Sequence, residues 1–393
     1  MKRNLLRNRD CQSEERVGSI ELLFDLVFVF AVTQISHIII LHPDPAGFVQ
    51  AAILFLAIWW VWIETAWVTN WLDVRHMSVR FLLFALMAGA LVMAISLPQA
   101  FAGRGLVFAG FFVAIQLGRH GFMLLALARH SRDNFRNFLR LTIWALAEAP
   151  FWIAGGLSAA PGTRMALWAA ALALLNLAPM TGLAVPFLGR SDTRTWDIEG
   201  HHFSERCSLF IIIALGESIV VTGAAVAETA WTAAALAAFA SAFVGTIAMW
   251  WLYFDIGAER AARLLARDKD PGRLARLAYT YLHMPIVAGI VVTAASDGMA
   301  VVQPAGQAGP AAIAALLGGP ALYLAGNLLF KRASGAEHFP LSHLVGLGLL
   351  AGTAPFAFAL SPAILSLCAT GALVLVAIWE LRSLRDTRRS LKV

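Results

Sequence analysis

Twelve long apolar stretches divide this chain of 393 residues, and they constrain its fold more than any other feature. A helix needs about 20 apolar residues to cross a bilayer, and windows of about 19 residues find segments of that length here. They cover residues 20–40, 48–68, 77–99, 106–127, 138–158, 165–186, 207–227, 231–254, 277–295, 310–329, 341–360 and 363–380. Only 14% of the residues are charged, against about 25% in soluble domains. The sequence therefore predicts an all-α polytopic membrane protein.

The basic residues indicate the orientation of these spans. If the N-terminus is cytoplasmic, the cytoplasmic segments hold almost every Lys and Arg outside the spans, and the opposite loops hold only Arg104 and Arg164. This distribution follows the positive-inside rule, so we expect both termini in the cytoplasm. It also accounts for the net charge of +6 without nucleic acid, and it makes the lipid bilayer the expected partner. The oligomeric state does not follow from the sequence.

Two similar segments suggest that the chain consists of two halves. WWVWIE (59–64) and WWLYFD (250–255) share two tryptophans, an aromatic residue and a carboxylate in register. Halves of six helices would have the same orientation in the membrane, although apolar helices also resemble each other by chance. The predicted parts are a cytoplasmic segment (1–19), a first half (20–186), a cytoplasmic linker (187–206), a second half (207–380) and a basic tail (381–393).

The first span, IELLFDLVFVFAVTQISHIII, carries polar side chains on two faces. Glu21, Asp25 and Ser36 lie along one stripe at about 100° per residue, and Gln34 and His37 lie on another face. A charge near the centre of a spanning helix costs about 2.5 to 3.5 kcal/mol. We therefore expect this helix in the interior of the bundle.

Other charged residues are predicted at a similar depth, in the cytoplasmic half of the membrane. Alternating helix directions place them in one polar layer with Asp25. They are Glu64, Arg80, Arg119, Arg206, Asp255 and His283. The arginines are possible counter-ions of the carboxylates or parts of a gate. His37 and His283 are possible proton relays, because the unperturbed pKa of imidazole is about 6.5.

Glu217 is the sharpest candidate site, because it lies in the motif ALGES near the middle of an apolar span. Gly216 permits close approach of a neighbouring helix, and Ser218 can hydrogen-bond the carboxyl group. Burial disfavours the charged form of the group, so Glu217 can act as a protonatable group of a carrier. It can equally act as a permanently hydrogen-bonded structural residue.

The loop before the seventh span contains possible metal ligands, His201, His202 and Glu205, without the HExxH spacing of a helical zinc site. An alternative is that Ser204 and Glu205 favour the start of the seventh helix by capping and by their interaction with its dipole. The chain has no P-loop, no GxGxxG before a helix and no GxSxG. We expect no cofactor, no catalytic residue and no ATP-driven pumping.

Several motifs resemble one known family. ELLFDLVFVFAVTQISH (21–37), NWLDVRH (70–76), HFSERCSLFIIIALGES (202–218), MWWLYFD (249–255) and YTYLHMPIVAGI (279–290) are similar to the bacterial low-temperature-requirement A (LtrA) family. The resemblance extends over most of the chain and implies a multi-pass protein of the bacterial inner membrane. The residues it marks are Glu21, Phe24, Asp25, His202, Glu205, Arg206, Gly216, Glu217 and His283.

The leading functional hypothesis is a proton-coupled secondary transporter or permease for a small solute or ion. Glu217 and Asp25 would be its coupling groups, with Glu21, Glu64 and Asp255 as gates. One alternative is an intramembrane enzyme acting on a lipid or isoprenoid. Another is a sensor or scaffold that transports nothing and whose buried charges only hold helices together.

Overall fold

The computed structural model describes residues 4–7, 17–196, 198–255, 257–336 and 339–384, and most of these are helical. The chain forms two compact units. The first unit contains residues 1–35, 49–206 and 268–273. The second unit contains residues 36–48, 207–267 and 274–393. Cys11 and most of the predicted basic tail lie outside the described residues.

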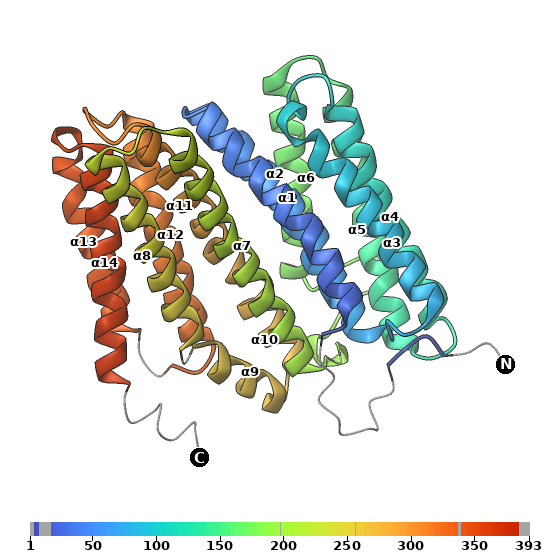
Figure 1. Cartoon of the computed structure of the whole chain (residues 1–393). Coiled ribbons are helices and arrows are strands. Elements are labelled where there is room, and N and C mark those ends of the chain that lie inside the picture. Colours follow the sequence, from blue (N-terminus) through green and yellow to red (C-terminus); the bar gives the residue numbers. More distant parts are fainter. Residues whose placement is uncertain (1–3, 8–16, 197, 256, 337–338, 385–393) are drawn as a thin grey trace. The chain divides into compact units, whose positions relative to one another are not determined.

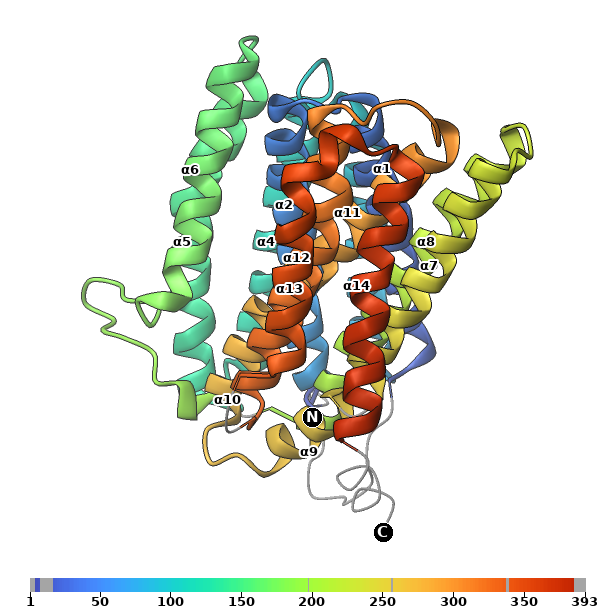
Figure 2. The same ribbon diagram turned by 90° about the vertical axis from the view of Figure 1, so that its left-hand side faces the viewer.

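The first unit is built on α2 to α6, together with the N-terminal parts of α1 and α7. Helix α3 packs on α4, α4 on α5, and α5 on α6, and Figure 2 shows α5 and α6 side by side. The bounds are α1 Ser19–Leu41, α2 Pro45–Trp71, α3 Met77–Ser96, η1 Leu97–Gln99, α4 Gly105–Leu127, α5 Arg132–Leu157, α6 Pro161–Met180, η2 Thr193–Thr195 and α7 Gly200–Glu228.

Aromatic side chains fill the space between α4, α5 and α6. The rings of Phe112 and Trp152 have centroids 4.3 Å apart, and those of Trp152 and Trp168 are 5.6 Å apart. Both tryptophans are fully buried. The indole of Trp168 also donates to the carbonyl of Trp152 at 3.0 Å, because a buried N–H needs a partner.

Arg164, one of the two arginines predicted on the side opposite the basic loops, is 5% exposed. Its guanidinium donates to the carbonyls of Ala100, Ala102, Gly155 and Ser158 at 2.6 to 3.0 Å. Helix ends and turns leave such carbonyls without intrahelical partners. The charge of Arg164 therefore has a structural use in joining these segments.

The second unit contains a layered bundle. Helix α8 packs on α11 and α14, and α12 packs on α11, α13 and α14; Figure 1 shows α8, α12, α13 and α14 together. The bounds are α8 Ala233–Phe254, α9 Gly257–Arg267, α10 Pro271–Leu274, the π-helical turn η3 Ala275–Tyr281, α11 His283–Val302, α12 Pro310–Ala333, α13 Leu341–Thr353, η4 Ala354–Ala359 and α14 Pro362–Ser383.

Glycines allow α11 and α12 to pack at close range. A Cβ atom added to Gly319 would lie 2.7 Å from the backbone nitrogen of Thr293, and one on Gly326 would lie 2.9 Å from that of Ile286. A Cβ on Gly289 would collide with the backbone of Tyr323. Small residues at helix contacts are typical of membrane proteins, and these three let the two backbones meet.

The prediction of an all-α polytopic membrane protein is confirmed. Among the described residues, eleven helical segments are long and apolar enough to cross a membrane. They match eleven of the twelve predicted spans. The twelfth, α5, is 26 residues long, but its first third is rich in charged and polar residues.

Two of the predicted boundaries that were wrong have reasons visible in the backbone. The span predicted at 165–186 ends at Met180, because Gly182 and Leu183 have positive φ angles of 69° and 52° that a helix cannot continue through. The helix predicted to start near Ser204 begins at Gly200 instead. Its first turn is capped by Glu199, whose carboxylate accepts from the backbone N–H groups of His201 and His202.

Candidate functional site

The first unit contains a buried group of charges that we call the Arg206 cluster: Glu21, Asp25, Trp62, His202 and Arg206. Glu21 and Asp25 are one helical turn apart on α1, and both are 0% exposed. Arg206 reaches them from the second turn of α7, with Nη1 3.1 Å from Glu21 and Nη2 2.6 Å from Asp25. The indole of Trp62 on α2 donates to Asp25 at 2.8 Å. Three helices thus meet at one guanidinium.

His202 contacts three polar side chains. The Asn70 amide nitrogen lies 2.8 Å from the carbonyl of Glu199 and 3.3 Å from Nδ1 of His202. Nε2 of His202 lies 3.1 Å from the carboxylate of Glu21 and 3.1 Å from Nη2 of Arg7. His202 therefore links α7 to α1, to α2 and to the N-terminal segment.

The N-terminal segment adds a second guanidinium to this cluster. Arg7 Nη2 lies 3.6 Å from Glu21, and its Nε donates to the carbonyls of Thr69 and Leu72 at 3.0 and 3.1 Å. The two carboxylates therefore have two arginines within ion-pair distance. The Arg206 cluster is close to charge balance, which is what buried ions need.

A second group lies between α2, α4 and α5, and we call it the Glu64 cluster: Glu64, Gln116, Arg119, His120 and Glu148. Arg119 is 0% exposed. Its Nη2 donates to the carboxylate of Glu64 and to Gln116, and its Nη1 donates to Thr65 at 3.0 Å. His120 Nε2 lies 3.3 Å from Glu64.

The carboxyl group of Glu148 has fewer hydrogen-bond partners than that of Glu64. It is 2% exposed, and its Oε2 has no hydrogen-bond partner among the described residues. It is close enough to interact electrostatically with both Glu64 and Arg119. In the same part of the chain, Gln116 Nε2, Arg119 Nε and His120 Nδ1 also have no partner. This cluster therefore contains several buried polar atoms without a hydrogen-bond partner among the described residues.

The charges of the Glu64 cluster do not balance. Two carboxylates face one guanidinium, so the group has a net charge of −1 unless His120 or one carboxyl group binds a proton. An unbalanced charge is costly in a bilayer and in a protein interior. The arrangement can therefore take up and release one proton.

The structure places the other predicted residues outside these two clusters. Arg80 is exposed and donates to the carbonyl of Val74 at 3.1 Å. His37 is exposed, although Ser36 beside it is buried. Glu217 is 1% exposed within α7, and Asp255 is half-buried at the C-terminal end of α8.

His283 lies in the second unit beside the π-helical turn. Its Nδ1 is 2.9 Å from the carbonyl of Ala278, and its Nε2 is 2.7 Å from the hydroxyl of Tyr253. Because a carbonyl only accepts, Nδ1 carries the proton and Tyr253 donates to Nε2. The rings of Tyr279 and His283 stack with centroids 4.9 Å apart.

The three possible metal ligands do not form one group. His202 faces Glu21, and Glu205 accepts from the backbone N–H of Val17 at 3.0 Å. The described residues contain no group of three His, Cys, Asp or Glu side chains placed to hold a metal ion.

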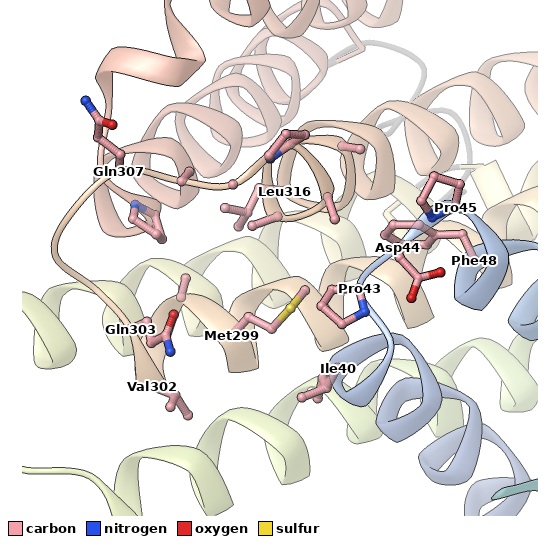
Figure 3. Close-up of a pocket in the computed structure, with 18 of the residues that line it drawn as sticks. Ile40, Pro43, Asp44, Pro45, Phe48, Met299, Val302, Gln303, Gln307 and Leu316 are labelled. Carbon is pink, nitrogen blue, oxygen red and sulfur yellow. The ribbon is translucent and has the colours of Figure 1, made fainter.

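A pocket of about 840 Å³ opens at one end of the second unit. In Figure 3, Ile40 and Phe48 lie on the blue segment, and Met299 and Leu316 lie on the pale orange helices. Its lining is mainly apolar, and Asp44, Gln303 and Gln307 supply polar groups. Asp44 also caps α2 by accepting from the N–H of Gly47 at 2.9 Å.

The sequence is similar to known proteins over nearly its full length. Residues 16–378 match the family model described as bacterial low temperature requirement A protein (LtrA). The chain is 42% identical over 377 residues to "Uncharacterized protein RA0937" of Rhizobium meliloti (strain 1021), which is 94% of this chain and 90% of the relative. No solved structure matches. On this evidence the chain belongs to the bacterial low temperature requirement A family of multi-pass membrane proteins.

Proposed function

We propose that this protein is a proton-coupled secondary transporter for a small solute or ion. The observation that carries the proposal is the charge imbalance of the Glu64 cluster, where the half-buried carboxylate of Glu64 and the buried carboxyl group of Glu148 share one guanidinium. Buried ionisable residues in membrane spans are rare and commonly belong to ion pathways or proton relays. In this proposal Glu64 and Glu148 share the coupling proton.

The proton affinity of the cluster depends on Arg119. When Arg119 contacts Glu64, as it does here, that carboxylate stays charged and Glu148 is the group that binds the proton. If a helix movement separates Arg119 from Glu64, the proton affinity of Glu64 rises and that of the whole cluster changes. Such a link between helix position and proton binding is the basis of coupling.

The Arg206 cluster has a different role in the proposal. Its two carboxylates are paired with arginines. Arg206 joins α1 to the start of α7 through Glu21 and Asp25. It acts as a gate or lock that holds these helices together, with Arg7 and His202 as additional contacts to Glu21. Glu217, Asp255, His37 and His283 remain proposed participants in coupling or relay.

The proposed setting is the bacterial inner membrane, with both termini in the cytoplasm. The partners are membrane lipids and an unidentified solute or ion. The similar segments 59–64 and 250–255 are proposed to mark two related halves. Their carboxylates, Glu64 and Asp255, would be equivalent positions.

The proposal is tested with purified protein in liposomes loaded with the pH dye pyranine. Inorganic cations, inorganic anions, amino acids and organic cations are added outside one at a time. We expect at least one of these solutes to change the internal pH with the wild-type protein. Glu148→Gln should abolish that change while the same solute still shifts the unfolding temperature.

Two results would contradict the proposal. One is a solute whose entry is unaffected both by a pH gradient and by Glu148→Gln. The other is that no solute class moves protons although the protein is folded. As a matched control, Glu228→Gln changes an exposed carboxylate at the end of α7 and should leave proton flux unchanged.

The matched ions of the Arg206 cluster favour a second candidate, a sensor or scaffold that transports nothing. Every charge in a purely structural network has a partner, as Glu21 and Asp25 have here. This candidate predicts that Glu217→Gln and Glu148→Gln preserve function and that only variants which damage folding lose it.

A further inference from the structure

The second unit buries a carboxyl group that sequence analysis did not identify. Asp297 lies on α11 and is 5% exposed. Its Oδ1 is 3.2 Å from the hydroxyl of Ser366 on α14. Ser366 is in turn 3.0 Å from the hydroxyl of Ser241 on α8. Side chains from three helices thus form a chain of oxygen atoms that ends at the Asp297 carboxyl.

The number of protons limits these hydrogen bonds. Ser366 has one hydroxyl proton and lies within donating distance of both Asp297 and Ser241, so it donates to one of them at a time. Thr370 donates to the carbonyl of Ser241 at 3.1 Å and fixes α14 against α8. Ser366 is therefore the hydroxyl group that contacts Asp297 directly, and Ser241 is the other partner of Ser366.

Asp297 has no charged partner among the described residues. Titratable groups do occur on the elements around it, but none lies within ion-pair or hydrogen-bond distance of its carboxyl. They are His283 on α11 itself, His37 on α1, Asp44 at the pocket, Cys207, Glu217 and Glu228 on α7, Tyr253 on α8, Tyr323, Lys331 and Arg332 on α12, and Cys368, Glu380 and Arg382 on α14. A lone buried carboxylate is unfavourable, so Asp297 needs a proton or a cation.

The wall of the pocket in Figure 3 lies one helical turn from Asp297 and from Ser366. Ala300 and Pro362 line the pocket. Ala300 is three residues after Asp297, and Pro362 is four residues before Ser366, so each pair shares one helix face. The pocket wall is thus one turn from the Asp297–Ser366 pair, and residues such as Gln303 and Gln307 at the pocket are exposed. Its volume admits water.

We propose that Asp297 is an exchangeable proton-binding site, with Ser366 and Ser241 as its hydrogen-bond partners and the pocket as its access route. Binding transfers a proton from water to a carboxylate oxygen, and release reverses that step. A proton fits better than a metal cation, because only one side-chain oxygen of the described residues is within hydrogen-bond distance of the carboxyl, whereas cations take six or more oxygen ligands in sites such as those of Ca²⁺. The site does not depend on the proposed transport function, because it binds its proton in the resting protein.

The test is pH-difference infrared spectroscopy of the full-length protein in lipid nanodiscs. We expect a carbonyl band of a protonated carboxylic acid that grows as the pH is lowered and exchanges in D₂O. One component of this band should be lost in Asp297→Asn and retained in Glu148→Gln. In Ser366→Ala it should remain but shift in frequency, because the acid loses its hydroxyl partner. Glu228→Gln, which changes an exposed carboxylate, should leave the band unchanged.

Three outcomes would overturn the inference. The titrating band could persist unchanged in Asp297→Asn, or the Asp297 band could be present at every pH and fail to exchange in D₂O. The band could instead appear only when Na⁺ is removed at constant pH, which would make Asp297 a sodium site. If Asp297→Asn does not fold, the frequency shift in Ser366→Ala decides the question, and an unshifted band would contradict the proposal.

Discussion

The Arg206 cluster in the first unit and Asp297 in the second unit are buried in different ways. In the first unit, Glu21 and Asp25 contact Arg206 directly, at 3.1 and 2.6 Å. In the second unit, Asp297 contacts a hydroxyl group and no cation among the described residues. A carboxylate with an arginine stays charged and holds helices together, whereas one among hydroxyls gains stability by binding a proton. The difference separates structural charges from exchangeable ones.

The Glu64 cluster combines both arrangements within the first unit. Glu64 is paired with Arg119, but Glu148 shares that single guanidinium at a greater distance. The second unit also has a paired carboxylate, Glu380, which lies 2.6 Å from Lys331. Pairing is therefore a property of each site and does not distinguish the units as a whole. The following variants test it site by site.

The largest effect is expected from removing the guanidinium of the Arg206 cluster. Arg206→Leu leaves Glu21 and Asp25 buried without their main partner, which typically costs about 3–5 kcal/mol of stability. We expect little folded protein, measured by thermal unfolding in detergent. Adding Glu21→Gln and Asp25→Asn to this variant should restore much of the stability. Failure of the triple variant to recover would contradict the ion-pair explanation.

Glu64 and Glu148 should respond differently to the same change. Glu64→Gln removes the charged partner of Arg119, and hydrogen bonds to charged groups contribute about 1.5–3 kcal/mol. Glu148→Gln replaces a group that we propose is already neutral, so it should leave the unfolding free energy unchanged or raise it. Urea or thermal unfolding of both variants measures the difference. Equal destabilisation would show that Glu148 is a charged structural residue.

The contact between α11 and α12 in the second unit should depend on close helix packing. Gly319→Ala places a methyl group 2.7 Å from the Thr293 backbone nitrogen, and overpacking of this kind costs about 1–3 kcal/mol. The neighbouring Gly318 has nothing within 4 Å of an added Cβ. Gly318→Ala should therefore be neutral or stabilise α12, since alanine favours helix by up to about 1 kcal/mol. Thermal unfolding of the two variants compares them directly.

The smallest effect belongs to an ion pair outside the spans. The Arg75 side chain, bonded to Asp73 at 2.9 Å, holds the pKa of that carboxyl below its usual value. The stabilisation is present above the unfolded pKa of about 3.9 and is lost as the pH falls through the lower folded pKa. Arg75 is exposed, so the pair contributes only about 0.2–1 kcal/mol.

Arg75→Ala provides the measurement for this surface pair. Its unfolding temperature should be slightly below that of the wild type at neutral pH and should converge with it in acid. A gap that widens in acid would have the wrong sign for a lowered pKa.

Hydropathy was sufficient to predict the helical membrane fold, because each span is a local property of about 20 residues. The contacts between charged side chains were harder to predict. The sequence indicated that Asp25, Glu64, Arg119 and Arg206 lie at similar depth, but not that Arg206 contacts residues about 180 positions earlier. Arg80 was predicted in the same layer and instead lies exposed at the start of α3.

Asp297 was missed because of a boundary error. The predicted span ended at residue 295, whereas α11 continues to Val302. The segment AASDG (294–298) lowers the local hydropathy, but it is followed by the apolar residues MAVV and contains no basic residue. That pattern could have indicated that the span continues beyond residue 295. Gln116 gave a weaker signal, because a single uncharged polar residue in a span does not reveal which helix it faces.

The most direct test of the central claim is the charge that moves in proteoliposomes after a rapid pH jump, measured by solid-supported membrane electrophysiology without any solute. A proton that binds the Glu64 cluster inside the membrane should produce a transient current in the wild-type protein. We predict that Glu148→Gln reduces the transferred charge and that Glu228→Gln does not. An identical transient in the wild type and Glu148→Gln would contradict proton binding at this cluster.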